Sequence, residues 1–267
     1  MNRFVHTLSL PVALVALMLG VAGRGATAAE PQRAAGQPVA LRVIEATTPR
    51  LAVPNYETRG SYPQVAGGHT SLTAVNAALT RALRSEQRRY ARVARDEQRE
   101  VSPVGGPGLF STNLKRSVLS ASSVVVSGLI PLTERFPGGN EGQTWLAVTV
   151  RVPSGARVSI SDLFNDRARG LRALAAAVRT RLPAGNSCIR KSLKALPTMA
   201  RGFAPTKVNY RYFALQTSGL VIGFPVSQVG FPPCSRVSTT VPYATLRAEL
   251  SPLAKRLIAG VRQPRTG

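Results

Sequence analysis

The sequence predicts one folded domain that contains both α-helices and β-strands. Apolar residues make up 44% of its 267 residues, which supplies a core and fits the length of a single domain. Residues 72–100 have the three- and four-residue apolar spacing of an amphipathic helix, whereas residues 109–160 have the β-branched and alternating segments typical of strands. No internal repeat divides the chain.

Residues 1–28 are expected to be a signal peptide. Arg3 gives a positive start, an apolar run covers residues 8–22, and Ala26-Thr27-Ala28 fits the cleavage rule. The run of about fifteen residues is shorter than the ~20 that span a membrane, so we expect no transmembrane anchor. The mature chain is therefore expected to be secreted or otherwise extracytoplasmic, in the cell wall or periplasmic space.

The first elements of the mature chain precede a long helix. Residues 29–60 are expected to form a flexible N-terminus with short strands at 39–44 and 51–53. Residues 61–65 are expected to be extended, because Pro63 disfavours a helical Tyr62. The helix at 72–100 is expected to end at a Pro- and Gly-rich linker, and its apolar face is expected to contain Leu72, Val75, Leu79, Leu83, Tyr90 and Val93.

Six arginines follow the same helical spacing on roughly the opposite face. One interpretation is a solvated outer face, which is normal on an amphipathic helix. The other is a surface that binds polyanions. The six residues are Arg81, Arg84, Arg88, Arg92, Arg95 and Arg99.

The rest of the chain is expected to alternate between strands and helices. Residues 117–129 read as one strand, and residues 145–152 read as a strand that forms a hairpin with 157–160. Helices are expected at 167–182, 187–199 and 243–261, the last broken near Pro252; strands at 210–215, 220–224 and 237–241; and a short tail at 263–267.

The charge is strongly positive. The chain has 35 Lys+Arg against 12 Asp+Glu, a formal +23, and removal of residues 1–28 leaves 33 against 12, a formal +21. Coding bias toward arginine and attraction to an anion are both consistent with this excess. The expected partner is an anionic envelope polymer or an acidic extracellular protein. Nucleic acid is not expected, because export is expected and the chain lacks interleaved aromatic and basic motifs.

Two cysteines in an oxidising compartment predict a disulfide between Cys188 and Cys234. The alternative is a cysteine nucleophile beside His69, the only histidine of the mature chain. The supply of Cys and His is too small for a four-ligand zinc site, so we expect no metal and no cofactor.

The sequence assigns no catalytic residue. It lacks the G-x-S-x-G and S-x-x-K motifs of hydrolases. A carboxylate pair drawn from Glu134, Glu141, Asp162 and Asp166 keeps a cell-wall-directed hydrolase open as the alternative function. Asp162 is expected to cap a helical turn, and Glu134 and Glu141 are expected to be solvated beside a loop. The preferred expectation is a non-catalytic binding domain.

Five phrases occur in an order that resembles a known domain. They are Ser61-Tyr62-Pro63-Gln64-Val65, residues 152–164, Tyr212-Phe213-Ala214-Leu215, residues 219–225, and Val241-Pro242-Tyr243-Ala244-Thr245-Leu246. Together they resemble the extracytoplasmic C-terminal domain of the anti-sigma factor RsiV. That domain also accompanies some peptidoglycan deacetylases and resembles a small secreted mycobacterial immunogenic antigen.

The resemblance implies an α+β domain over residues 61–262, a mostly antiparallel sheet with packed helices. In RsiV the domain is a receptor for lysozyme, but a +21 chain would repel the common basic lysozymes, so an anionic partner is expected instead. The metal motifs of the deacetylases are absent from this sequence. The loop at 137–142 also lacks the histidine that many relatives carry there.

Overall fold

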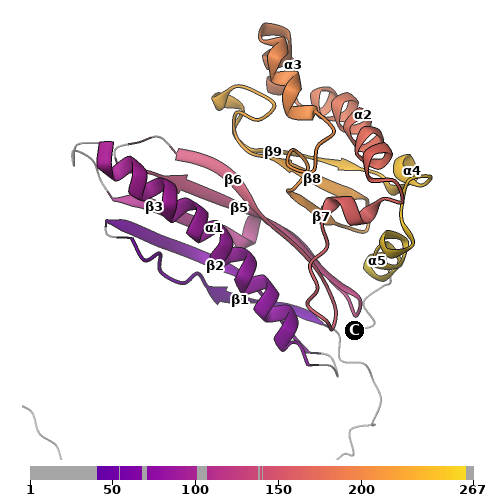
Figure 1. The fold of residues 1–267 in the computed structure, drawn as a ribbon, viewed down its shortest axis with the longest axis horizontal. Coiled ribbons are helices and arrows are strands. Elements are labelled where there is room, and N and C mark those ends of the chain that lie inside the picture. The colour runs from indigo at the N-terminus through magenta and orange to yellow at the C-terminus, as the bar shows by residue number, and fades with distance from the viewer. Residues whose placement is uncertain are drawn as a thin grey trace, which may run out of the picture. The chain divides into compact units, whose positions relative to one another are not determined.

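The computed structural model of the protein describes residues 41–53, 55–67, 71–100, 107–137, 139 and 141–262, without the side chains of 95–100 and 262. Figure 1 shows these residues as two sheets with helices packed on them. The expected signal peptide, His69 and the expected tail lie outside the described residues.

The larger sheet has six strands. Their order is β1-β2-β3-β5-β4, with β6 on the other edge of β5. β5 pairs with β4 through its first half, with β3 through its second half, and with β6 along its whole length. Only β2 and β3 run parallel within this sheet, so it is mostly antiparallel, as predicted. The strands are β1 (Arg42–Thr47), β2 (Tyr56–Ala66), β3 (Gly108–Thr112), β4 (Val118–Ala121), β5 (Val125–Arg135) and β6 (Glu141–Arg151).

The smaller sheet has three antiparallel strands, β7 (Phe213–Leu215), β8 (Leu220–Phe224) and β9 (Val237–Val241), with β8 in the centre. Every residue of β8 is buried, which fits a strand that is apolar on both faces.

The helices lie between and after these strands in the chain. Asp166 begins α2 by accepting the N–H groups of Ala168 and Arg169, and these bonds, that from Arg169 above all, lower the pKa of its carboxyl group. The α-helices are α1 (Thr73–Glu100), α2 (Arg167–Gly185), α3 (Ser187–Ala195), α4 (Tyr243–Leu246) and α5 (Pro252–Arg262).

The elements form four layers. Because side chains alternate along a strand, β5 and β6 present one set of residues to α1 and the other set to the smaller sheet. Ile130 and Leu146, which are opposite each other in register, pack in the core under α1. Leu129 and Trp145 pack with Ala214 of β7. The other face of the smaller sheet is covered by α2, α4 and α5, as Figure 1 shows.

Hydrogen bonds from side chains join the two sheets. The hydroxyl of Ser120 donates to the carbonyl of Leu215 (2.7 Å), and the N–H of Leu215 donates to Ser127 Oγ (2.8 Å). The indole N–H of Trp145 donates to the carbonyl of Phe224 (3.2 Å). These bonds satisfy polar groups inside an otherwise apolar interface.

Replacing Ser127 by Ala is expected to lower the free energy of unfolding by about 2 kcal/mol, because it leaves the buried N–H of Leu215 without a partner. Chemical denaturation measures the loss. Ser218→Ala removes the same hydroxyl from an exposed turn nearby and serves as the control. Equal stability of the two variants would contradict the role given to Ser127.

Several predicted elements differ from the structure. Residues 51–53 form no strand; the N–H of Leu51 donates instead to Thr58 Oγ1 (2.8 Å). The expected strand at 117–129 is two strands, because Ser122 Oγ accepts the N–H groups of Val124 and Val125 and turns the chain. The expected boundary at residue 61 falls inside β2, so the sheet begins before it.

Two further predictions were wrong in detail. The partner of β6 is β5, and Arg157 makes only an isolated bridge to Val150, because residues 160–163 form a 3₁₀ turn. In α1, Val93 is 38% exposed and Ala94 is fully buried in its place. The helical period of 3.6 residues carries the apolar face from Tyr90 to Ala94 rather than to Val93.

Candidate functional site

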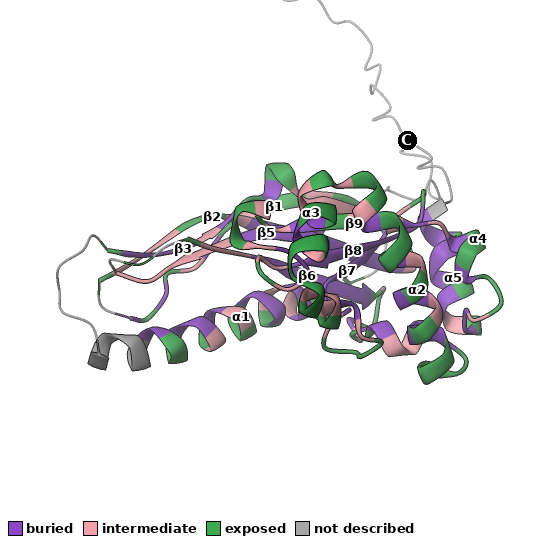
Figure 2. Cartoon of the chain, turned by 90° about the horizontal axis from the view of Figure 1, so that it is seen from above, coloured by how far each residue is buried: buried purple, intermediate pink, exposed green. Residues whose placement is uncertain are grey.

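The arginine row of α1 lies on its solvent-facing side. We use this name for Arg81, Arg84, Arg88 and Arg92, which are all exposed, whereas Val75, Leu79 and Leu83 on the other side are buried. Figure 2 shows the exposed and buried sides of this helix. The side chains of Arg95 and Arg99, also predicted for the row, lie outside those described.

The arginine row is not neutralised by acids in the described part of the chain. None of its four guanidinium groups forms an ion pair there, and Arg84 donates only to the amide oxygen of Gln87 (3.3 Å). Four like charges on one helix face repel each other. Among the described side chains, the row thus presents positive charge to solvent without an acidic partner.

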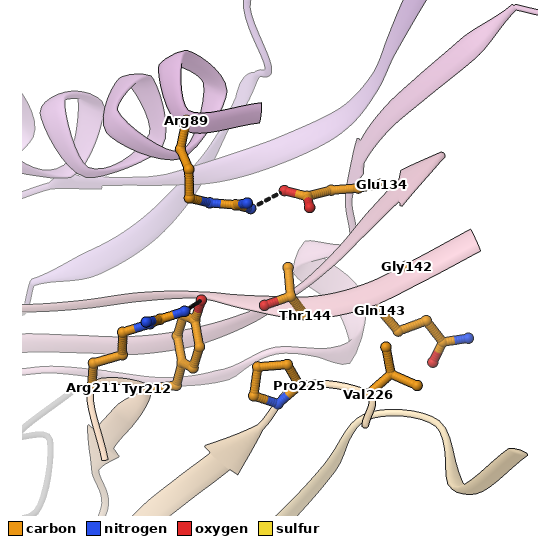
Figure 3. Close-up of a pocket in the computed structure, with 9 residues that line it drawn as sticks. All are labelled: Arg89, Glu134, Gly142, Gln143, Thr144, Arg211, Tyr212, Pro225 and Val226. Atoms are coloured by element: carbon orange, nitrogen blue, oxygen red, sulfur yellow. Dashed lines mark hydrogen bonds and ion pairs between the residues drawn. The ribbon is translucent and has the colours of Figure 1, made fainter. Parts of the chain in front are cut away.

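A second feature is a pocket of about 240 Å³ beside the first residues of β6, the strand at one edge of the larger sheet. Figure 3 shows two pairs of side chains in it, Arg89 with Glu134 and Arg211 with Tyr212, on either side of Thr144. α1, β5, β6 and the segments that flank β7 and β8 all contribute to the lining: Arg89, Glu134, Gly142, Gln143, Thr144, Arg211, Tyr212, Pro225 and Val226.

Glu134 is the acidic group of this pocket. Its side chain is 13% exposed, and its Oε1 accepts a hydrogen bond from Arg89 Nη2. Arg89 Nε donates to Glu86 Oε2 (2.8 Å), so one guanidinium serves two carboxylates. Glu134 was expected to be solvated; the structure instead holds its side chain, mostly shielded from solvent, against α1.

The pKa values of Glu134 and Arg89 are shifted by burial and by the two carboxylates, Glu134 and Glu86, that Arg89 contacts. Burial raises the pKa of Glu134 to about 7, Arg89 opposes the rise, and the neighbouring charge of Glu86 adds to it. Burial acts to lower the pKa of Arg89, but Glu134 and Glu86 together hold it above its ordinary value. Arg89 therefore keeps its charge while Glu134 titrates near neutral pH.

The other side of the pocket is rich in hydrogen-bond donors. Arg211 is exposed, its Cζ lies 4.6 Å from the centre of the Tyr212 ring, and its Nη2 donates to the Tyr212 hydroxyl (2.8 Å). Thr144 lies between the two pairs, and its hydroxyl has no partner among the described residues. Pro225 and Val226 add an apolar wall.

The four candidate carboxylates occupy different environments. Glu134 is opposite Gly142 in register and Glu141 is opposite Arg135, so these neighbouring pairs point to opposite faces of the sheet. Asp162 accepts the N–H of Ser159 (2.8 Å), which confirms its predicted capping role. Asp166 caps α2.

Cys188 and Cys234 form the predicted disulfide, with the sulfur atoms 2.06 Å apart. Neither cysteine is a free thiol, which leaves no nucleophile for the alternative pairing with His69. Across residues 41–262, where they are described, no three His, Cys, Asp or Glu side chains gather as a metal site would require. The same residues include no helix with the length and apolar character of a membrane span.

Sequence reasoning missed the pocket because its residues are far apart in the chain. Arg89 and Glu134 are 45 residues apart, and Arg89 lies beside the row of six arginines rather than in it. Tyr212 and Pro225 belong to two of the five phrases that carry the family resemblance. The presence of Tyr212 and Pro225 in these phrases was the one sequence feature that pointed to the pocket. It did not indicate which other residues lie next to them.

Comparisons with known proteins identify the fold. No family model matches the chain, and no curated protein matches it. A solved DUF3298 family protein from Bacteroides fragilis is 14% identical, with a TM-score of 0.53 over 84% of this chain and 97% of that one. Another from Pseudomonas aeruginosa is 11% identical, with a TM-score of 0.51 over 82% and 97%. At this level of identity the similarity extends to the fold alone.

Proposed function

We propose that the protein is an extracytoplasmic, non-catalytic binding domain that recognises an anionic polymer of the cell envelope through the arginine row. The observation that carries the proposal is that Arg81, Arg84, Arg88 and Arg92 are exposed on one helix face without acidic partners among the described residues. A linear polyanion fits such a face because arginine binds phosphate and carboxylate groups in a fixed, forked geometry.

The finer assignment to an RsiV-like domain belongs to this proposal. The five sequence phrases support it, and so does the DUF3298 fold of the two solved structures. Export is supported by the N-terminal sequence and by the disulfide, which is a bond typical of oxidising compartments.

Replacing all four residues of the arginine row by Gln is expected to weaken binding of linear polyphosphate and to reduce its dependence on salt. Each lost contact removes one released counterion, so the slope of log K against log salt should become shallower by roughly 3. Fluorescence anisotropy with labelled polyphosphate, over a series of salt concentrations, measures both quantities with residues 29–267.

The matched control replaces Arg172, Arg201, Arg247 and Arg256 by Gln, which are exposed residues of the other half of the chain. It removes the same charge from a different surface. Equal losses in the two variants would show that total charge, and not the arginine row, determines binding. Salt-insensitive capture of one acidic protein from the extracellular fraction would likewise overturn the polymer proposal.

A further inference from the structure

The pocket beside β6 holds positive, neutral and negative groups whose hydrogen-bonding capacity is only partly used within the described chain. Arg211 is exposed and touches no carboxylate there, the Thr144 hydroxyl is unpartnered, and the bonds of Glu134 use only Oε1. These groups converge on one cavity (Figure 3). They lie on the edge of the sheet and do not include the arginine row.

Arg211 and the hydroxyls of Tyr212 and Thr144 match a carboxylate. A guanidinium that is held against an aromatic ring is oriented before the ligand arrives, and hydroxyl donors complete the coordination of two oxygens. Glu134 on the opposite side repels a second negative charge and accepts a hydrogen bond. It therefore disfavours a dianion such as phosphate and favours a ligand that also carries a donor.

The size and walls of the pocket narrow the choice further. A volume of about 240 Å³ lies below the roughly 300–1,000 Å³ of pockets for drug-sized ligands, so the ligand is of the order of one or two amino-acid residues. Pro225 and Val226 offer an apolar surface for a small side chain.

We propose that this pocket binds a carboxylate that has a neighbouring N–H donor, as at the carboxyl end of a short peptide. Arg211, Tyr212 and Thr144 hold the carboxylate, and Glu134 accepts the N–H. A free dipeptide and the end of a longer chain share this chemistry. The proposal does not depend on the binding of a polymer by the arginine row, because the two sites have no residue in common.

The test is titration of residues 29–267 with N-acetyl-L-alanyl-L-alanine at pH 8, followed by NMR of the protein. The C-terminal amide of the same dipeptide lacks the charge and is expected to bind about tenfold to a hundredfold more weakly, the value of a charged hydrogen bond. Arg211→Gln is expected to produce a loss of the same size. Thr144→Val, which keeps the shape of the side chain, is expected to produce a smaller one.

Arg256→Gln is the matched control, since it removes an exposed arginine elsewhere and should leave the affinity unchanged. Circular dichroism checks that each variant is folded. The proposal would be overturned by equal affinity for the acid and the amide, or by an unchanged affinity in Arg211→Gln. It would also be overturned if no binding were seen at roughly 10 mM dipeptide, a concentration tenfold above the Kd of about 1 mM that a weak ligand has.

A longer acetylated peptide with the same C-terminal pair distinguishes the two sources. Affinity equal to that of the dipeptide indicates a chain end, and weaker affinity indicates a free small molecule. The variant of the arginine row should bind the dipeptide as the wild type does, so failure of the pocket and failure of the polymer site give different results.

Discussion

Replacing both Cys188 and Cys234 by Ala is expected to lower the free energy of unfolding by about 4 kcal/mol, the value of loop-closure entropy for residues this far apart. The bond ties α3 to the 3₁₀ turn at Pro232–Cys234 that precedes β9. Ser192 of α3 packs beside it, where its Oγ accepts the N–H of Phe231 (3.1 Å). Denaturant titration at one pH measures the loss.

The reduced wild-type protein is the control for this prediction. It keeps both sulfur atoms and therefore separates the loss of the covalent link from the loss of side-chain volume. Reduced wild type and double variant should be about equally destabilised. A double variant as stable as the oxidised protein, or an exported protein whose mass shows two free thiols on alkylation, would contradict the prediction.

Stability is expected to fall as the pH rises from about 4.5 to about 7 because of Glu134. The folded state binds a proton at this group more tightly than the unfolded chain does, since burial raises its pKa from 4.5 to about 7. The stabilisation is fully present below pH 4.5, the pKa in the unfolded chain, and is lost as the pH rises to about 7, the pKa in the folded protein. The shift corresponds to roughly 3 kcal/mol.

Glu134→Gln isolates this contribution, because the amide keeps the shape of the side chain and does not titrate. The charged groups around it, Glu86 and Arg89 of α1 and Arg211 beyond Thr144, stay in place. The difference in unfolding free energy between the variant and the wild type, measured from pH 4 to pH 8, should move by roughly 3 kcal/mol in favour of the variant. A difference that is independent of pH would show that folding does not change the pKa of Glu134.

The spacing of apolar residues within one segment correctly predicted the helices and strands that depend on that segment alone. The helix at 72–100 and the central strand at 220–224 occur almost as predicted, because each is defined by its own spacing of apolar residues. The turn at Ser122 was missed because its side-chain hydrogen bonds override the strand preference of the surrounding residues.

In the candidate sites, too, local features could be predicted and contacts between distant segments could not. The arginine row could be predicted because its spacing is local to one helix. The burial of Glu134 could not, since its neighbours are polar and its partner Arg89 is on another element. The environment of a charged residue depends on which strands pair and in which register, and the local patterns of one sequence do not reveal that pairing.

Trp145 gives the molecule a natural optical probe. It is the only tryptophan of the chain, it lies between the two sheets, and the guanidinium of Arg236 sits 5.6 Å from its ring. Separation of the sheets would expose the indole to water and shift its fluorescence to longer wavelength. The emission of the unlabelled protein therefore reports on this one interface, while circular dichroism follows the helices, so the two signals together distinguish opening between the layers from unfolding of the whole chain.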